Sequence, residues 1–182
     1  MRTIIIRVAN KTPATAEIKK ISQKSLDDFK TFWLPRIEAE RQQDETYWNW
    51  LYKERLYGLR GNYETYAIEC DLITQGMMLI ETRNHRSRFD ENRRLVYVAI
   101  LQTAPWNLPN SKPEPLFRTV GAALLTFAKR RSKQLGYGGL VGLHSLPRAE
   151  KFYQKMNMID CGQDKEKDGL AYFEWYKTGD SS

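Results

Sequence analysis

The sequence predicts a single α/β domain, because stretches with the periodicity of strands and of helices alternate along one chain of 182 residues. The clearest part is a strand at 95–103, a proline-rich loop, and an amphipathic helix that begins near Arg118 and ends at Leu135. Glycines at 136–139 stop this helix, and a short apolar strand at 140–144 and a helix at 148–156 follow. The content of 41% hydrophobic residues is enough for one buried core.

The N-terminal half predicts the remaining elements. A strand is expected at 3–8, and a largely helical stretch, broken near Pro35, is expected at 14–58. Its apolar face is given by Ile18, Ile21, Leu26 and Phe29. Strands at 63–71 and 77–83, a charged loop at 84–94 and a last strand at 171–177 complete the order.

The first turn of the helix near Arg118 has the composition of a phosphate site. Small residues there leave the backbone open, and the first turn of a helix presents N–H groups without partners at the positive end of the helix dipole. A phosphate could therefore approach the backbone, with Arg118 adding a cation beside it. The ordinary alternative is a helix end that needs small residues only to pack closely on a sheet.

Two motifs in residues 95–158 favour the phosphate site. Arg118, Gly121 and Ala123 match the acyl-CoA motif Arg/Gln-x-x-Gly-x-Gly/Ala. Residues 149–155 match Ala-x-x-Phe-Tyr-x-Lys, a second motif that follows the first one along the chain in proteins that carry both. With the order of elements, these motifs resemble the GNAT N-acetyltransferase superfamily. The chain departs from that pattern at Leu146, where the superfamily usually has Asn, and at 157–158, where Asn-Met replaces Gly-Phe.

The resemblance implies a fold and a cosubstrate. The expected fold is a mixed, mostly antiparallel twisted sheet of six to seven strands flanked by about four helices, in one acyl-CoA-dependent acyltransferase-like domain over residues 1–182. The expected acyl donor is acetyl-CoA, with its pyrophosphate on successive amides of the helix turn and its thioester near the end of the strand at 95–103. The implied cofactor-binding residues are Gln102, Thr103, Arg118, Thr119, Val120, Gly121, Ala122 and Ala123.

The resemblance also implies the reaction, which is transfer of an acetyl group to a primary amine by direct attack on the thioester. Tyr153 occupies the position of the general acid that protonates the departing CoA thiolate. For the proton of the amine, Glu81 is the expected acceptor, with Glu69 and His144 as alternatives. No Cys or Ser has the neighbours of a covalent nucleophile, and no metal-ligand spacing is present.

The charge of the chain leaves two other functions open. The net charge of +7 is concentrated in part at 83–94 and 129–133, so a GNAT-fold enzyme acting on an RNA-linked acceptor, such as aminoacyl-tRNA, is one alternative. A solvated basic face is the ordinary explanation of such clusters. A catalytically silent acyl-CoA-binding module is the second alternative, motivated by Leu146 and the uncertain base.

The composition of the chain limits where the protein is expected in the cell and which partners it is expected to have. No apolar run has transmembrane length, so no membrane partner is expected. Two cysteines imply no disulfide framework, and the expected location is cytoplasmic. The expected acceptor is a small-molecule or protein amine. A homodimer could form if the strand at 171–177 has an exposed edge.

Overall fold

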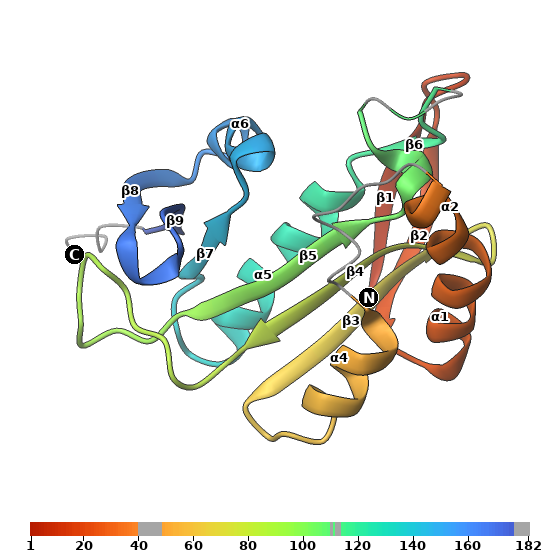
Figure 1. The fold of residues 1–182 in the computed structure, drawn as a ribbon. Coiled ribbons are helices and arrows are strands. Elements are labelled where there is room, and N and C mark those ends of the chain that lie inside the picture. Colours follow the sequence, from red (N-terminus) through yellow and green to blue (C-terminus); the bar gives the residue numbers. More distant parts are fainter. Residues whose placement is uncertain (40–48, 110, 112–113, 177–182) are drawn as a thin grey trace. The chain divides into compact units, whose positions relative to one another are not determined.

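The computed structural model describes residues 1–39, 49–109, 111 and 114–176. Over these residues the chain has a mixed α/β fold with one sheet of nine strands, in the order β6-β1-β2-β3-β4-β5-β7-β9-β8 (Figure 1). β5 pairs with β7 in parallel, whereas β1–β2, β1–β6, β2–β3, β7–β9 and β8–β9 are antiparallel. The mixed sheet is confirmed, and the expected count of six to seven strands was wrong.

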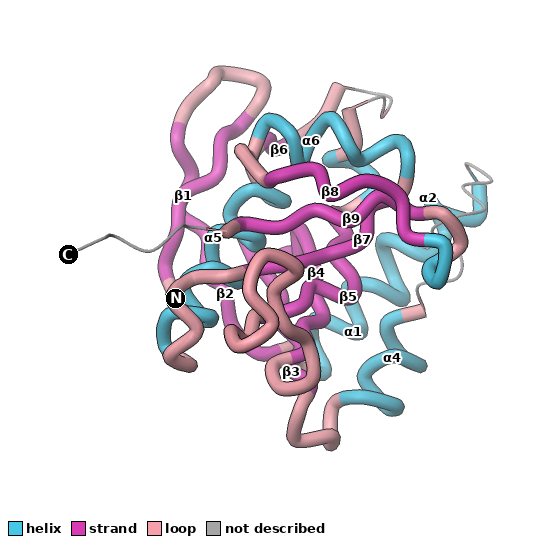
Figure 2. Tube along the Cα trace, turned by 90° about the vertical axis from the view of Figure 1, so that its left-hand side faces the viewer, coloured by secondary structure: helices cyan, strands magenta, loops and turns pink. Residues whose placement is uncertain are grey.

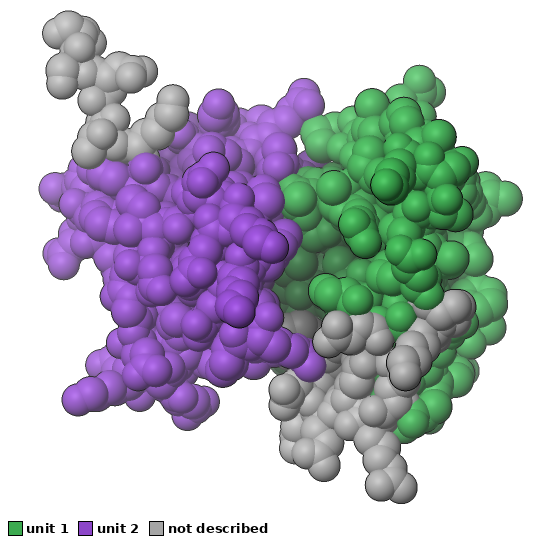
Figure 3. All heavy atoms as spheres, turned by 90° about the horizontal axis from the view of Figure 1, so that it is seen from above, with its two compact units in different colours: residues 1–79, 100–124 green, residues 80–99, 125–182 purple. Residues whose placement is uncertain are grey.

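The chain divides into two compact units, which Figure 3 colours separately. Unit 1 comprises Met1–Leu79 and Ile100–Leu124, and unit 2 comprises Ile80–Ala99 and Leu125–Ser182. Three elements contribute residues to both units: β4 (Ile73–Glu81), β5 (Val96–Thr103) and α5 (Val120–Gln134). The single acyltransferase-like domain over residues 1–182 stays a prediction.

Unit 1 begins with a hairpin of β1 (Arg2–Arg7) and β2 (Pro13–Lys20). The helix expected from residue 14 was therefore wrong over β2. Burial along β2 alternates with a period of two, because Ala14, Ala16 and Ile18 are buried and the residues between them are exposed. The spacing of Ile18 and Ile21 fits a helix as well, which misled the prediction. β2 also pairs with β3 (Tyr63–Cys70).

The helices between β2 and β3 supply the aromatic core of unit 1. Within the described ranges they are α1 (Gln23–Asp28), the π-helix η1 (Phe29–Trp33), α2 (Leu34–Ala39) and α4 (Trp50–Tyr57). Residues 40–48 of the expected helical stretch lie outside the described residues. No described helix is long and apolar enough to cross a membrane. The core cluster consists of Phe29, Trp33, Ile37, Trp50, Ala67, Met77, Leu79, Ile100, Ala104 and Trp106.

The start of α5 packs closely on β4 at Gly76. A Cβ added to Gly76 would lie 2.8 Å from Cγ1 of Val120, 3.0 Å from Cδ1 of Leu124 and 3.1 Å from Cγ2 of Ile68. Val120 is 2% exposed and Leu124 is fully buried. The absence of a side chain at position 76 therefore lets the first turn of α5 approach the sheet, which sets the position of the residues that precede the helix.

Unit 2 contains the C-terminal elements. They are β7 (Val141–Ser145), the 3-10 turn η3 (Pro147–Ala149), α6 (Glu150–Lys155), β8 (Ile159–Asp164), η4 (Lys165–Lys167) and β9 (Leu170–Trp175). The strand expected at 171–177 is β9, but it is not an edge strand, because it lies between β7 and β8 (Figure 2). Residue 177 lies outside the described residues. One or two strands were expected after the helix at 148–156, but no range was assigned to β8, because its residues are mostly exposed and show no alternation.

Candidate functional site

The turn that leads into α5 is held by β6 (Phe117–Arg118) and a left-handed residue. β6 pairs with β1 through Ile6↔Arg118 and Arg7↔Phe117, and the Phe117 N–H donates to Oδ1 of Asn107 at 2.9 Å. Thr119 then has a φ of 68°, a conformation that a β-branched residue rarely adopts. Such strain, about 1–3 kcal/mol, persists only where the surrounding structure holds it and is typical of binding sites.

The amides that follow Thr119 have no hydrogen-bond acceptor within the helix. The first bond of the helix is donated by the Ala123 N–H to the Thr119 carbonyl, at 2.9 Å. The amides of Val120, Gly121 and Ala122 precede this bond, so the helix supplies them with no acceptor. They stand at the positive end of a helix of 15 residues. The arrangement can bind an anion through backbone N–H groups.

Arg118 supplies a cation to this turn. Its side chain is 69% exposed, and its guanidinium lies 4.0 Å from the carboxylate of Glu114, which is 70% exposed. An exposed pair at this distance contributes little to stability. The Arg118 side chain can therefore turn to a bound anion at small cost.

Gln102 and Thr103 lie at the end of β5, in unit 1. Gln102 is 3% exposed, and its Oε1 accepts a hydrogen bond from Nε1 of Trp50 at 2.6 Å. Its amide nitrogen is buried and has no hydrogen-bond partner among the described residues. Thr103 is half-buried, and the next residue, Ala104, donates its N–H to the carbonyl of Gln75 at 2.9 Å. The predicted cofactor-binding residues, 102–103 and 118–123, thus all belong to unit 1.

Tyr153 lies on α6 in unit 2, where its ring is buried. It is 7% exposed and packs against Phe152 and Phe173, with ring centroids 5.0 Å and 5.7 Å away. Burial, with a smaller contribution from nearby Tyr97, raises the pKa of the Tyr153 hydroxyl well above its usual range. The hydroxyl has no hydrogen-bond partner in the part of the chain that the structure describes. At neutral pH it is a protonated donor.

Glu81 lies at the end of β4, also in unit 2, and its carboxylate holds a turn. Oε1 accepts from the N–H groups of Arg83 and Asn84 at 3.0 Å and 3.1 Å, and Oε2 accepts from Asn84 at 3.0 Å. Nε2 of His85 lies 3.7 Å from Oε2. The side chain is 1% exposed. The structure therefore gives Glu81 a positioning role at this turn, and its role as the base stays a prediction.

The alternative bases have different surroundings. Glu69, in unit 1, is paired with Lys19 at 2.8 Å. His144, at the end of β7, lies between two partners: its Nδ1 is 2.8 Å from the Tyr97 hydroxyl, and its Nε2 is 3.0 Å from Oδ2 of Asp164. The carboxylate of Asp164 can only accept, so Nε2 carries the proton and Nδ1 accepts from Tyr97.

The environment of His144 keeps the imidazole neutral. Burial lowers its pKa below 6.5 despite the hydrogen bond to Asp164, and the positive charges of Arg88 and Lys167 lower it further. Arg88 also pairs with Asp164. A Tyr–His–Asp chain of this kind can move a proton from the hydroxyl to the imidazole, with the carboxylate stabilising the imidazolium that forms.

Sequence reasoning considered His144 but missed Tyr97 and Asp164. The contacts join residues 47 and 20 positions apart, and no local motif marks them. Asp164 could have been suggested only by recognising β8, whose exposed residues show no strand pattern. Among the described residues, no group of three His, Cys, Asp or Glu side chains could hold a metal ion.

Solved structures show which known proteins share this fold. The Bacillus subtilis N-acetyltransferase YlbP, in complex with coenzyme A, is 18% identical, with 89% of this chain and 97% of that chain covered and a TM-score of 0.54. The PaiA N-acetyltransferase from Thermoplasma acidophilum, in complex with coenzyme A, is 14% identical, with coverages of 89% and 99% and a TM-score of 0.56.

A third similar structure is FeeM, an N-acyl amino acid synthase from uncultured soil microbes. It is 12% identical, with 88% of this chain and 89% of that chain covered and a TM-score of 0.59. No protein-family model and no curated protein matches the sequence. At these identities the likeness concerns the fold, and the chain has the fold of the GNAT N-acetyltransferases, as its motifs predict.

Proposed function

We propose that this protein is an N-acyltransferase that uses an acyl-CoA, with acetyl-CoA as the donor. The observation that carries the proposal is the α5 turn, where left-handed Thr119 precedes three amides without helical acceptors and exposed Arg118 stands beside them. This arrangement suits the pyrophosphate of CoA. Two of the similar structures are N-acetyltransferases with bound coenzyme A, which supports the same ligand.

The reaction needs polarisation of the thioester carbonyl. As the amine attacks, the C–N bond forms and negative charge builds on the carbonyl oxygen, which fixed backbone N–H groups stabilise most effectively. We assign this to the backbone at Gln102 and Thr103. Their strand is kept in place by the Trp50 bond to Gln102 and the Ala104 bond to Gln75.

The departing group is the CoA thiolate, released when the C–S bond breaks. Tyr153 is assigned as the general acid that gives it a proton, a contribution of roughly 10²–10⁴-fold when the donor is well placed. Its raised pKa keeps the hydroxyl protonated at neutral pH, and its lack of a partner among the described residues leaves the proton available.

The amine nitrogen must also lose a proton. Glu81 is the acceptor predicted from the sequence, but both of its oxygens already accept backbone N–H groups. The hydrogen bonds of His144 make it the better candidate for the proton acceptor. Tyr97 would take the proton of the amine and pass its own hydroxyl proton to the neutral Nδ1 of His144. The variants His144→Gln and Glu81→Gln distinguish the two residues. Replacing the true proton acceptor should lower kcat and remove the acid limb of the pH–rate profile, while the affinity for CoA stays unchanged.

Thermal unfolding with acetyl-CoA, CoA and longer acyl-CoAs tests the cofactor site. A ligand that binds only the folded state raises the midpoint, by an amount that grows with its concentration. We expect a rise with wild type that disappears in Gly121→Leu, because Gly121 is buried in the first turn of α5 and a leucine side chain there displaces the backbone that carries the amides. Gly61→Leu is the matched control, since nothing lies within 4 Å of a Cβ at that position.

Two results would contradict the proposal. No rise with any acyl-CoA at concentrations well above micromolar would mean that the turn serves only to pack the helix. Binding without release of free CoA thiol in the presence of any amine in a broad panel would favour the silent acyl-CoA-binding module instead.

A further inference from the structure

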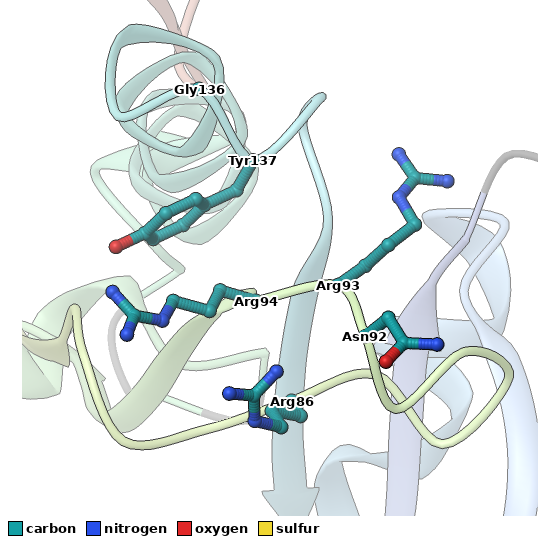
Figure 4. A pocket seen from close by; sticks show the side chains of 6 residues that line it. All are labelled: Arg86, Asn92, Arg93, Arg94, Gly136 and Tyr137. Atoms are coloured by element: carbon teal, nitrogen blue, oxygen red, sulfur yellow. The ribbon is translucent and has the colours of Figure 1, made fainter.

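A cavity lies wholly within unit 2 and shares no residue with the α5 turn. Its volume is about 360 Å³, which falls in the range of small-molecule sites. Of the described residues, three arginines and no carboxylate line it. The lining residues are Arg86, Asn92, Arg93, Arg94, Gly136 and Tyr137 (Figure 4).

The arginines come from the loop at 82–94, and two buried carboxylates hold this loop. At its start, Glu81 accepts the backbone N–H groups of Arg83 and Asn84. In its middle, the fully buried Glu174 of β9 accepts from Ser87 Oγ at 2.5 Å and from the Arg88 N–H at 3.0 Å. A long loop fixed by buried charges is preorganised, so a ligand need not order it on binding.

The loop also places two like charges opposite each other. Arg86 and Arg94 form an antiparallel bridge, and the Ser87 N–H donates to the Arg93 carbonyl at 2.9 Å. Like charges directly opposite each other in such a pair are destabilising. Neither arginine forms an ion pair with a described carboxylate; Arg86 only donates to the Glu91 carbonyl, at 2.9 Å. A bound anion would relieve this repulsion.

The third arginine is engaged elsewhere. The Arg93 guanidinium lies 5.7 Å from the ring centroid of Tyr176, and its Nη2 is 2.7 Å from the position of a Cβ on Gly138. In Figure 4 its side chain points away from Tyr137, whereas those of Arg86 and Arg94 extend toward the Tyr137 side. Arg86 and Arg94 are therefore the two cations that face a ligand.

Tyr137 gives the cavity an aromatic wall. Its hydroxyl donates to the Thr82 carbonyl at 2.8 Å, which ties the ring to the start of the loop. Gly136, with a φ of 81°, turns the chain at the end of α5 and adds no side chain. An aromatic ring beside arginines is the combination that binds nucleotides, because the ring stacks on a base and the guanidinium forks bind phosphate in pairs of hydrogen bonds.

We propose that this cavity is a nucleotide-binding site, in which Arg86 and Arg94 hold a phosphate and the Tyr137 ring stacks on the base. The phosphate can belong to a free mononucleotide or to a single-stranded RNA, and the binding experiment separates these sources. The proposal stands independently of the acyltransferase function, since the two sites have no residue in common.

Binding is measured by fluorescence anisotropy with a labelled 12-nucleotide single-stranded RNA and by calorimetry with AMP, each at several salt concentrations. We expect Arg86→Gln/Arg94→Gln to weaken the tighter ligand at least tenfold. For RNA, the slope of log affinity against log salt should fall by about 0.7 for each phosphate that the variant no longer neutralises. Arg86→Lys/Arg94→Lys should recover only part of the affinity, because an ammonium lacks the planar fork.

The control is Lys151→Gln/Lys165→Gln, which removes the same charge from exposed positions of unit 2. AMP binding equal to that of RNA identifies a mononucleotide site, and much tighter salt-dependent RNA binding identifies a strand site. The proposal is overturned if neither probe binds, if the lysine control weakens binding as much as the arginine variant, or if saturating CoA displaces both probes. Equal melting temperatures of the variants confirm that the fold is kept.

Discussion

Trp50 donates its indole N–H to Oε1 of Gln102, 2.6 Å away, and both side chains are buried. This bond joins α4 to the end of β5, next to the backbone that we assign to the thioester carbonyl. Gln102→Leu should reduce the free energy of unfolding by about 1–3 kcal/mol, because the Trp50 N–H is left buried without an acceptor.

Urea unfolding of Gln102→Leu, Trp50→Phe and the double variant checks this prediction. The double variant should be more stable than the sum of the two single losses indicates, since it removes both partners together. Additive losses would show that the bond contributes nothing specific.

Thr119 is a second residue whose replacement tests both the stability of the fold and the affinity for CoA. Thr119→Gly should raise the free energy of unfolding by up to about 1 kcal/mol, because glycine adopts the left-handed conformation without the clash of a β-branched side chain. Affinity for CoA should stay within about threefold, since the amides keep their positions. Thr119→Val is the control that retains the strain, and a less stable glycine variant would contradict the prediction.

A variant of Tyr153 should separate the binding of CoA from the catalytic turnover. Tyr153→Phe should lower kcat by roughly 10²–10⁴-fold and leave the Kd for CoA unchanged, because it removes only the proton donor. Stability should change little, since the hydroxyl has no partner among the described residues. Tyr172→Phe, which removes a hydroxyl bonded to Glu174, is the matched control. Unchanged turnover in Tyr153→Phe would remove this residue from the mechanism.

The two histidines predict how stability depends on pH. Burial lowers the pKa of both His85 and His144 below 6.5, so the unfolded chain binds protons at a higher pH than the folded protein does. Stability is therefore fully present above about pH 6.5 and is lost as the pH falls through the folded values. Asp164, whose pKa is lowered by its bond to His144, stays ionised in this range.

Unfolding free energies at pH 7.5, 6.5 and 5.5 measure this dependence. His144→Gln should show a shallower fall than wild type, because one of the two groups that take up protons on unfolding is removed. The same slope in both proteins would mean that the environment of His144 does not disfavour its charge. His85→Gln gives the corresponding value for the histidine that stacks on Tyr97.

Local patterns predicted the parts of this fold that local forces determine. The strand β5, the helix α5 and its glycine end were predicted because periodicity and capping residues lie within one window of sequence. Asn157, where the superfamily has Gly, has a φ of 56°, and Asn is one of the few residues that tolerate the left-handed region. β2 was assigned wrongly because its apolar spacing fits both periods.

Contacts between residues that are distant along the chain could not be predicted from the sequence. His144 could be named as a titratable group, but its contacts with Tyr97 and Asp164 depend on the pairing of four strands, β5, β7, β9 and β8. Glu81 was expected to take the proton of the amine, which stays a prediction, and the contacts of its carboxylate with backbone N–H groups could not be foreseen. The alternation of side chains along a strand predicts the face of a residue but not which groups it meets there.

The bond between Ser87 and Glu174 also constrains the order of events during synthesis. These residues are 87 positions apart, so the arginine loop lacks its central anchor until β9 has left the ribosome. A nascent chain stalled before β9 can already fold the β1–β2 hairpin, whose contacts are local. The ligand proposed for the cavity of unit 2 should therefore bind only a protein whose translation has passed Glu174.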